Sequence, residues 1–159
     1  MDEIADKIYS NQDIINRICF AFFSERADRE DLFQEIVYRV LKFYRGFNEK
    51  SSFTTWLYRI ALNTAITYKT KKRPDFPEDK SQAKIEDNSE SNDLDEDIRI
   101  LYKEIGQLAK LEKAIILLYL DEYSYREIAE ITGLSPKNVS VKIYRIKKKL
   151  HELYIKLTV

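Results

Sequence analysis

Glycine, proline, cysteine and histidine are all scarce in this chain of 159 residues, and each shortage excludes a class of structure. Three glycines and three prolines leave little room for tight β-hairpins or for a glycine-rich loop that cradles phosphates. The single cysteine, Cys19, excludes an intramolecular disulfide and a thiolate zinc cluster. The single histidine, His151, excludes the usual zinc sites and catalytic triads. These shortages argue against an all-β fold and a nucleotide-loop enzyme. Together with the helical periodicity described below, they lead us to expect an all-α protein that is not an enzyme and carries no metal or cofactor.

Long apolar runs are absent as well. No run approaches the ~18 residues that a membrane helix needs, and the acidic opening Met1-Asp2-Glu3 does not fit a signal peptide. We therefore expect a cytoplasmic protein with no membrane insertion.

The net charge is zero, but this zero results from a cancellation along the chain. Residues 39–73 carry a net charge of +8, residues 74–97 carry −8, and residues 137–149 hold six bases and no acid. Two separate basic segments predict two contacts with a polyanion, and the acidic segment between them would repel one. On charge alone, the basic segments fit solvated helix faces equally well.

The acidic segment 74–97 also divides the chain. It contains two prolines, many Ser, Asn and Asp residues and few aliphatic ones, which is typical of a flexible linker without a core of its own. We expect two small helical domains, 1–73 and 98–159, each of marginal stability because of its size.

Apolar periodicity predicts three helices before the linker, at residues 4–23, 28–44 and about 52–72. Gly46 follows the second helix, Ser51 or Ser52 can cap the third, and Pro74 ends it. The apolar side of the second helix is predicted to carry Phe33, Ile36, Val37, Val40, Leu41 and Tyr44.

One stripe of the third helix has the composition of a nucleic-acid contact. Trp56, Arg59, Asn63 and Thr67 are spaced by three, four and four residues and lead toward a cluster of bases at 69–73. An aromatic ring, an amide and a basic end can hold single-stranded nucleic acid by stacking and hydrogen bonding. The alternative is that Trp56 belongs to the core and that the bases favour a helix C-terminus.

The segment 124–150 carries a more specific pattern. Ser124 and Glu127 form a capping box, Gly133 allows a sharp turn, and Ser135 with Pro136 starts a further helix. The buried seam of that last helix is predicted to be Val139, Ile143, Ile146 and Leu150. Its remaining side is basic and free of acids, which predicts a helix-turn-helix with its second helix in the DNA major groove.

These segments together resemble a bacterial RNA polymerase sigma factor of the extracytoplasmic-function (ECF) group. DLFQEIVYRVLKFYRGF (31–47) and SFTTWLYRIALNTAITY (52–68) are similar to conserved region two of that family, and residues 108–150 are similar to its region four. The resemblance implies that core RNA polymerase and promoter DNA are partners. It leaves open whether an anti-sigma factor also binds.

The resemblance also implies roles for individual residues. On the polymerase side it assigns Asp31, Gln34 and Glu35 to the contact with the clamp helices. For the melted minus-ten element it assigns Phe47, Trp56, Tyr58, Arg59 and Asn63. For the minus-thirty-five element it assigns Ser140, Val141 and Tyr144 to base reading, and Lys137, Lys142 and Arg145 as basic or phosphate-contacting neighbours.

Some features depart from the family pattern or allow other functions. The match begins near Ile4, so the first helix is expected to be short or missing, and Ser140 and Val141 replace the residues often found there, so the promoter sequence cannot be carried over. A stand-alone helix-turn-helix regulator with an N-terminal dimerisation or sensor bundle is the main alternative. A di-metal protein that uses Asp31 and Glu35 is a second one, although the paired Glu-x-x-His elements are missing.

Overall fold

The computed structural model describes the backbone of residues 2–68 and 96–158 and the side chains of residues 3–68 and 96–152. These residues form helices and short connections and include no strand, which confirms the predicted all-α class. The elements in chain order are α1 (Asp2–Ser10), α2 (Gln12–Phe22), α3 (Arg26–Phe43), the short 3-10 helix η1 (Tyr44–Gly46), α4 (Phe53–Thr67), α5 (Glu96–Ile105), α6 (Lys110–Leu120), α7 (Tyr125–Thr132) and α8 (Pro136–Thr158). The acidic linker predicted at 74–97 lies almost wholly outside the described residues.

The chain begins with two short helices, α1 and α2, so the prediction of one continuous helix over 4–23 is wrong. The break lies at Asn11, whose side-chain amide donates to the carbonyl of Lys7 at 2.8 Å. The carbonyl of Asn11 then accepts from the N–H of Ile14 at 3.1 Å and starts α2. Asparagine competes for backbone hydrogen bonds in this way, which favours a turn over a continuous helix.

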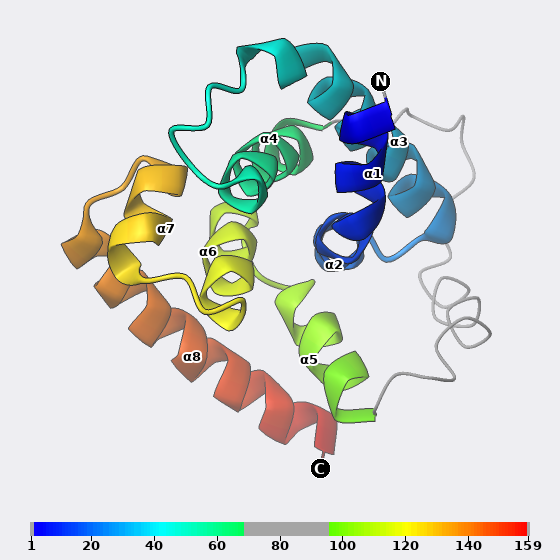
Figure 1. Ribbon diagram of the computed structural model, residues 1–159. Coiled ribbons are helices and arrows are strands. Elements are labelled where there is room, and N and C mark those ends of the chain that lie inside the picture. Colours follow the sequence, from blue (N-terminus) through cyan, green and yellow to red (C-terminus); the bar gives the residue numbers. More distant parts are fainter. Residues whose placement is uncertain (1, 69–95, 159) are drawn as a thin grey trace.

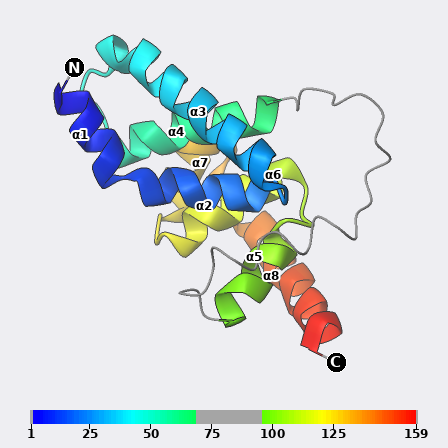
Figure 2. The same ribbon diagram turned by 90° about the vertical axis from the view of Figure 1, so that its right-hand side faces the viewer.

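Helices α2, α3 and α4 pack together as the N-terminal bundle (Figures 1 and 2). Ser52 caps α4 as predicted, because its hydroxyl accepts from the N–H of Thr55 at 3.2 Å. The helix ends at Thr67, five residues before the predicted end near Lys72. Leu41 was expected on the buried side of α3 but is exposed. The fully buried residues of this helix are Leu32, Ile36 and Val40, which follow one another at intervals of four.

The C-terminal bundle contains the predicted helix-turn-helix in α7 and α8. The capping box forms in both directions, with Ser124 Oγ accepting from the N–H of Glu127 at 3.1 Å and Glu127 Oε1 accepting from the N–H of Ser124 at 3.0 Å. Gly133 has a φ of 81°, a left-handed conformation that glycine adopts without strain. The predicted seam is confirmed, since Val139, Ile143, Ile146 and Leu150 are all buried.

Helix α6 joins the two bundles. It contacts α7 and α8 on one side and α2 and α4 on the other, and it lies between them in Figure 1. Six successive residues, Lys113–Leu118, are buried. A helix that is buried all round belongs to the inside of a core, so the two bundles share one apolar interior.

A carboxylate fastens α8 to the start of α6. Glu112 accepts from Lys149 Nζ at 2.8 Å and from the N–H of Ala109 at 3.1 Å. Burial alone would raise the pKa of Glu112, but these hydrogen bonds outweigh it and hold the pKa below the ordinary value.

We therefore expect Glu112→Gln to lower the free energy of unfolding by about 1 kcal/mol at neutral pH, because a charge-assisted contact is lost. A lowered carboxylate pKa stabilises the fold above the ordinary value of 4.5, and this stability is lost as the pH falls through the folded-state pKa. Urea unfolding at several pH values measures the difference. Glu130→Gln, at an exposed position of α7, is the matched control, and an equal effect of both variants at every pH would contradict the assignment.

Candidate nucleic-acid and polymerase interfaces

One side of α3 is exposed and mixed in character. Asp31 and Gln34 are exposed, and Glu35 is half-buried and accepts from Arg39 Nε at 3.0 Å. Tyr38 and Leu41 continue the same side one and two turns later and expose 58% and 43% of their surface. The structure therefore brings the three predicted polymerase contacts together. It adds two apolar neighbours that the sequence argument missed, although their spacing from Gln34 signals them.

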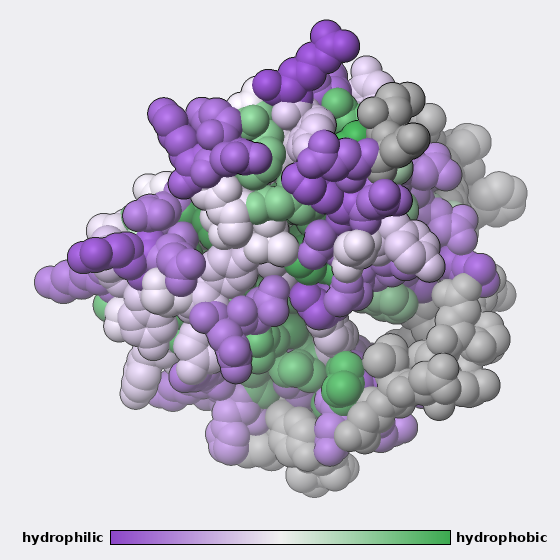
Figure 3. Space-filling model, viewed as in Figure 1, coloured by the Kyte–Doolittle hydropathy of each residue, from purple (hydrophilic) through white to green (hydrophobic). Residues whose placement is uncertain are grey.

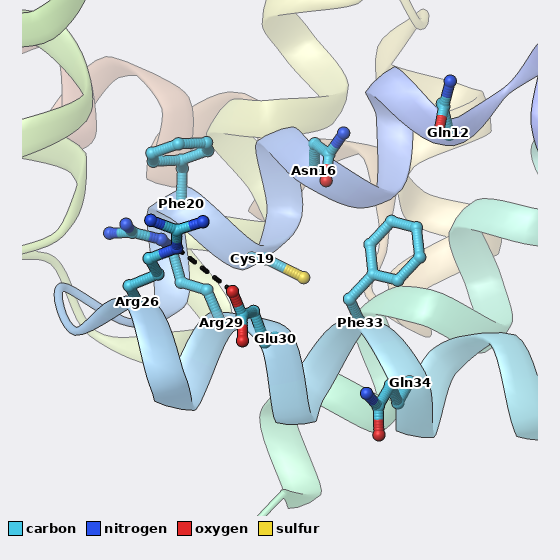
Figure 4. Close-up of a pocket in the computed structure, with 9 residues that line it drawn as sticks. All are labelled: Gln12, Asn16, Cys19, Phe20, Arg26, Arg29, Glu30, Phe33 and Gln34. Atoms are coloured by element: carbon cyan, nitrogen blue, oxygen red, sulfur yellow. Dashed lines mark hydrogen bonds and ion pairs between the residues drawn. The ribbon is translucent and has the colours of Figure 1, made fainter. Parts of the chain in front are cut away.

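A pocket of about 320 Å³ lies beside Gln34, between α2 and α3 (Figure 4). Arg29 lies against the ring of Phe20, with its guanidinium carbon 4.4 Å from the ring centroid, and donates to the carbonyl of Ser24 at 2.8 Å. The thiol of Cys19 points toward α3 at the inner side of this pocket. It is 2% exposed, and burial raises its pKa to about 12.

An aromatic cluster forms where η1 meets the start of α4. It consists of Tyr44, Phe47, Phe53 and Trp56, each half-buried. The ring centroids of Phe47 and Trp56 lie 5.1 Å apart, and those of Phe53 and Trp56 lie 5.7 Å apart. Trp56 thus belongs neither to the deep core nor to an open surface. The family resemblance assigned both Phe47 and Trp56 to the minus-ten element, but it did not assign Tyr44 or Phe53 to that site.

The exposed stripe of α4 extends from this cluster. Arg59, Asn63 and Thr67 are exposed, as the helical spacing predicted. The Thr67 hydroxyl donates to the backbone carbonyl of Asn63 at 2.9 Å, and the side chain of Asn63 is exposed. A guanidinium, an amide and four rings therefore lie along one continuous part of the N-terminal bundle.

Tyr58 is not part of this stripe, and its predicted place on the melting face is wrong for this arrangement. Its side chain is 1% exposed and lies between the two bundles. Its hydroxyl donates to Asp121 Oδ2 at 2.6 Å and accepts from Arg17 Nη2 at 3.4 Å. Burial, followed by the hydrogen bond to Asp121, raises the pKa of Tyr58 well above its usual range. The ring of Tyr123 packs edge-on against it, with centroids 5.4 Å apart.

The outward side of α8 matches the predicted duplex-reading surface. Its predicted contacts are exposed, apart from Lys142, which is half-buried: Lys137, Ser140, Val141, Lys142, Tyr144 and Arg145. Tyr144 is 71% exposed. Figure 3 shows that hydrophilic residues make up most of the visible surface of the molecule, with apolar residues between them.

The sequence predicts neither a metal site nor a membrane-spanning helix. Among the described side chains, those of residues 3–68 and 96–152, no group of three or more His, Cys, Asp or Glu residues is placed to hold a metal ion. Over the same residues, no helix is long and apolar enough to cross a bilayer.

Comparison with known proteins divides the chain into the same N-terminal and C-terminal parts. Residues 8–74 match the family model of sigma-70 region 2, and residues 98–150 match that of sigma-70 region 4. The ECF RNA polymerase sigma factor SigW of Bacillus subtilis is 30% identical over 170 aligned positions, covering 96% of this chain and 91% of SigW. The ECF RNA polymerase sigma-E factor of Escherichia coli K12 is 33% identical over 136 positions, covering 77% and 71%.

Solved structures show a similar fold. The sigma factor RpoE of Bartonella quintana, in complex with the anti-sigma factor NepR, superposes with a TM-score of 0.68 at 15% identity and covers 96% of this chain and 97% of its own. CnrH, in complex with the cytosolic domain of CnrY, superposes with a TM-score of 0.62 at 19% identity, covering 94% and 85%.

The hydrogen bond between Tyr58 and Asp121 gives a test of how the bundles pack. We expect Tyr58→Phe to lower the free energy of unfolding by about 1 kcal/mol, because Asp121 loses the Tyr58 donor and keeps only the longer ion pair with Arg17. We also expect a double-mutant cycle with Asp121→Asn to be non-additive. Tyr144→Phe, at a highly exposed tyrosine, is the matched control and should change nothing. Additive effects of the Tyr58 and Asp121 variants would show that this contact is not formed in solution.

Proposed function

Because this chain belongs to the ECF group of RNA polymerase sigma factors and directs the polymerase to promoters, we propose that its surfaces divide this task among polymerase binding, strand melting and duplex reading. The observation that carries the proposal is the separation of the exposed α4 stripe from the exposed side of α8, on two bundles that match regions two and four. A stand-alone regulator is not favoured, since the similarity to ECF sigma factors extends over 96% of the chain. The domain limits 1–73 and 98–159 remain part of the proposal.

We place the polymerase contact on α3. Asp31, Gln34 and Glu35 supply polar groups, and Tyr38 and Leu41 supply exposed apolar surface on the same side. Protein interfaces combine such an apolar centre with a polar rim. The apolar pair would supply most of the buried area, and the acids would select a basic partner surface.

We place strand melting on the aromatic cluster and the α4 stripe. Opening a promoter unstacks bases at a cost of a few kcal/mol per step. Stacking on aromatic rings returns about 1–3 kcal/mol per base. Phe47 and Trp56 offer ring faces, Asn63 offers an amide for a base edge, and Arg59 offers a cation for the backbone. The chain thus contributes specificity and melting, and the polymerase makes the RNA.

We place duplex reading on α8. Ser140, Val141 and Tyr144 lie on the exposed side of the helix that follows the turn, where a helix-turn-helix presents its base contacts. Lys137, Lys142 and Arg145 flank them and suit phosphates, which fix the register of the helix in the groove.

Two further assignments follow from family membership. We propose that the chain acts in the cytoplasm, where it meets the polymerase. We also propose an anti-sigma factor as a regulatory partner, because both solved relatives of similar fold were obtained in complexes, one of them with a protein named an anti-sigma factor.

The polymerase contact is tested by charge reversal. We expect Asp31→Lys with Glu35→Lys to weaken binding to core RNA polymerase and to reduce run-off transcription. The circular dichroism of the chain should stay unchanged, because Asp31 is exposed and the partly exposed i,i+4 pair of Glu35 with Arg39 contributes little to stability. Glu96→Lys, at an exposed position of α5, is the control for added positive charge. Unchanged affinity of the folded double variant for the core would refute the contact.

The division between melting and duplex reading is tested with premelted DNA. We expect Asn63→Ala to impair open-complex formation on duplex promoters and to recover in part on a template with a premelted bubble, because the opening cost is then removed. Tyr144→Ala should alter the preference at the upstream element by about 1–3 kcal/mol, without rescue by the bubble. Equal rescue of both variants would contradict the division.

A further inference from the structure

Helix α1 places one lysine over the aromatic cluster. Ile4 and Ile8 are buried and anchor α1 on the N-terminal bundle, whereas Glu3 and Asp6 face outward. Lys7 lies between these two sides, and its side chain is 32% exposed. The anchoring isoleucines therefore fix where this lysine can reach.

The ammonium of Lys7 lies close to three of the four rings. Its Nζ is 5.4 Å from the ring centroid of Phe53, 5.7 Å from that of Tyr44 and 5.9 Å from that of Phe47. It also donates to the Tyr44 hydroxyl at 3.4 Å, and this hydrogen bond raises the pKa of Lys7. Its ion pair with Glu3 is longer, at 3.6 Å, and Glu3 is 77% exposed. The lysine is thus in contact with the rings as well as with its acidic neighbour.

The rings and the ammonium together have the chemistry of a nucleotide site. A base that stacks on Phe47 or Phe53 needs a ring face that the ammonium now partly covers, so the ammonium must move aside. The nucleotide that brings the base also brings a phosphate, which is the strongest available ligand for a displaced lysine.

We propose that Lys7 is a positioning residue of the melted-strand site, where it covers the aromatic cluster in the free protein and binds the backbone phosphate of the unpaired nucleotide whose base stacks there. This rests on the proposed function of the cluster and adds a contact from α1 to it. The match to sigma-70 region 2 begins at residue 8, one residue after Lys7. Lys7 is supplied by α1, just before the matched segment.

The experiment measures binding of single-stranded DNA to the polymerase reconstituted with the full chain. The probe is a fluorescein-labelled oligothymidylate of about 12 nucleotides, since stacking on aromatic rings tolerates any base. Fluorescence anisotropy is followed from about 50 to about 200 mM salt, with core polymerase alone as the baseline.

Wild-type chain should bind the probe more tightly than the core alone. Lys7→Met should weaken this binding and reduce the slope of log affinity against log salt by about 0.7, the value for one lost phosphate contact on a single strand. The deficit should then be about threefold larger at the low-salt end than at the high-salt end. Lys7→Arg should keep the wild-type slope, and Lys103→Met, at an exposed lysine of α5, should leave both affinity and slope unchanged.

Phe47→Ala separates this proposal from the proposed function. It should weaken binding without changing the salt slope, because it removes a ring and no charge. If Phe47→Ala weakens binding while Lys7→Met keeps the wild-type affinity and slope, or binds more tightly, the phosphate role of Lys7 is overturned and the cluster remains a single-strand site. If the wild-type chain adds nothing to the core baseline, the melted-strand site itself is overturned.

Discussion

The middle of the apolar helix α6 is buried on every side, and the joining of the two bundles depends on it, because α2, α4, α7 and α8 all pack against it. Neither bundle is large enough to enclose much apolar surface alone, since small domains bury a smaller fraction of their surface. Helix α6 gives Ile115, Leu118 and their neighbours to an interior that α2 and α4 close from the other side. As a result, the packing of α6 sets the direction of α8 relative to the α4 stripe, although α6 itself contributes to neither of these two surfaces.

Polar groups fix the register of this junction. Tyr58, Arg17 and Asp121 satisfy one another where the bundles meet. Nearby, the ammonium of Lys113 lies 5.1 Å from the ring centroid of Phe22, and burial lowers its pKa. Apolar packing alone tolerates sliding, whereas a buried hydroxyl such as that of Tyr58 needs particular partners. The junction therefore combines an apolar centre with directional contacts, and one tyrosine takes part in both.

Local signals in the sequence were sufficient for much of this fold. The capping box at Ser124, the turn at Gly133 and the seam from Val139 to Leu150 depend on neighbours within a few residues, and all three are confirmed. The family resemblance likewise predicted the two helical domains. The exposure of Asn63 on α4 and of Tyr144 on α8 follows from helical spacing alone, while their roles stay predictions.

The wrong predictions concern residues whose burial or neighbours depend on contacts distant in sequence. Tyr58 is buried because α6 and the residues after it cover this part of α4. At the end of α3, Val40 is buried, whereas its neighbour Leu41 is exposed. The contact of Lys7 with the aromatic cluster was missed because Lys7 lies 37 positions before Tyr44 in the sequence. Periodicity identifies the sides of a helix, but it does not identify what covers them.

The burial of Cys19 has a practical consequence for chemical labelling. Thiol reagents attack the thiolate, and a thiol with a pKa of about 12 and 2% exposure presents almost none at neutral pH. Cys19 is also the single cysteine of the chain. A second cysteine engineered on an exposed side of α4 or α8 would then react selectively with a maleimide dye, so the natural sequence serves directly as the background for fluorescence work.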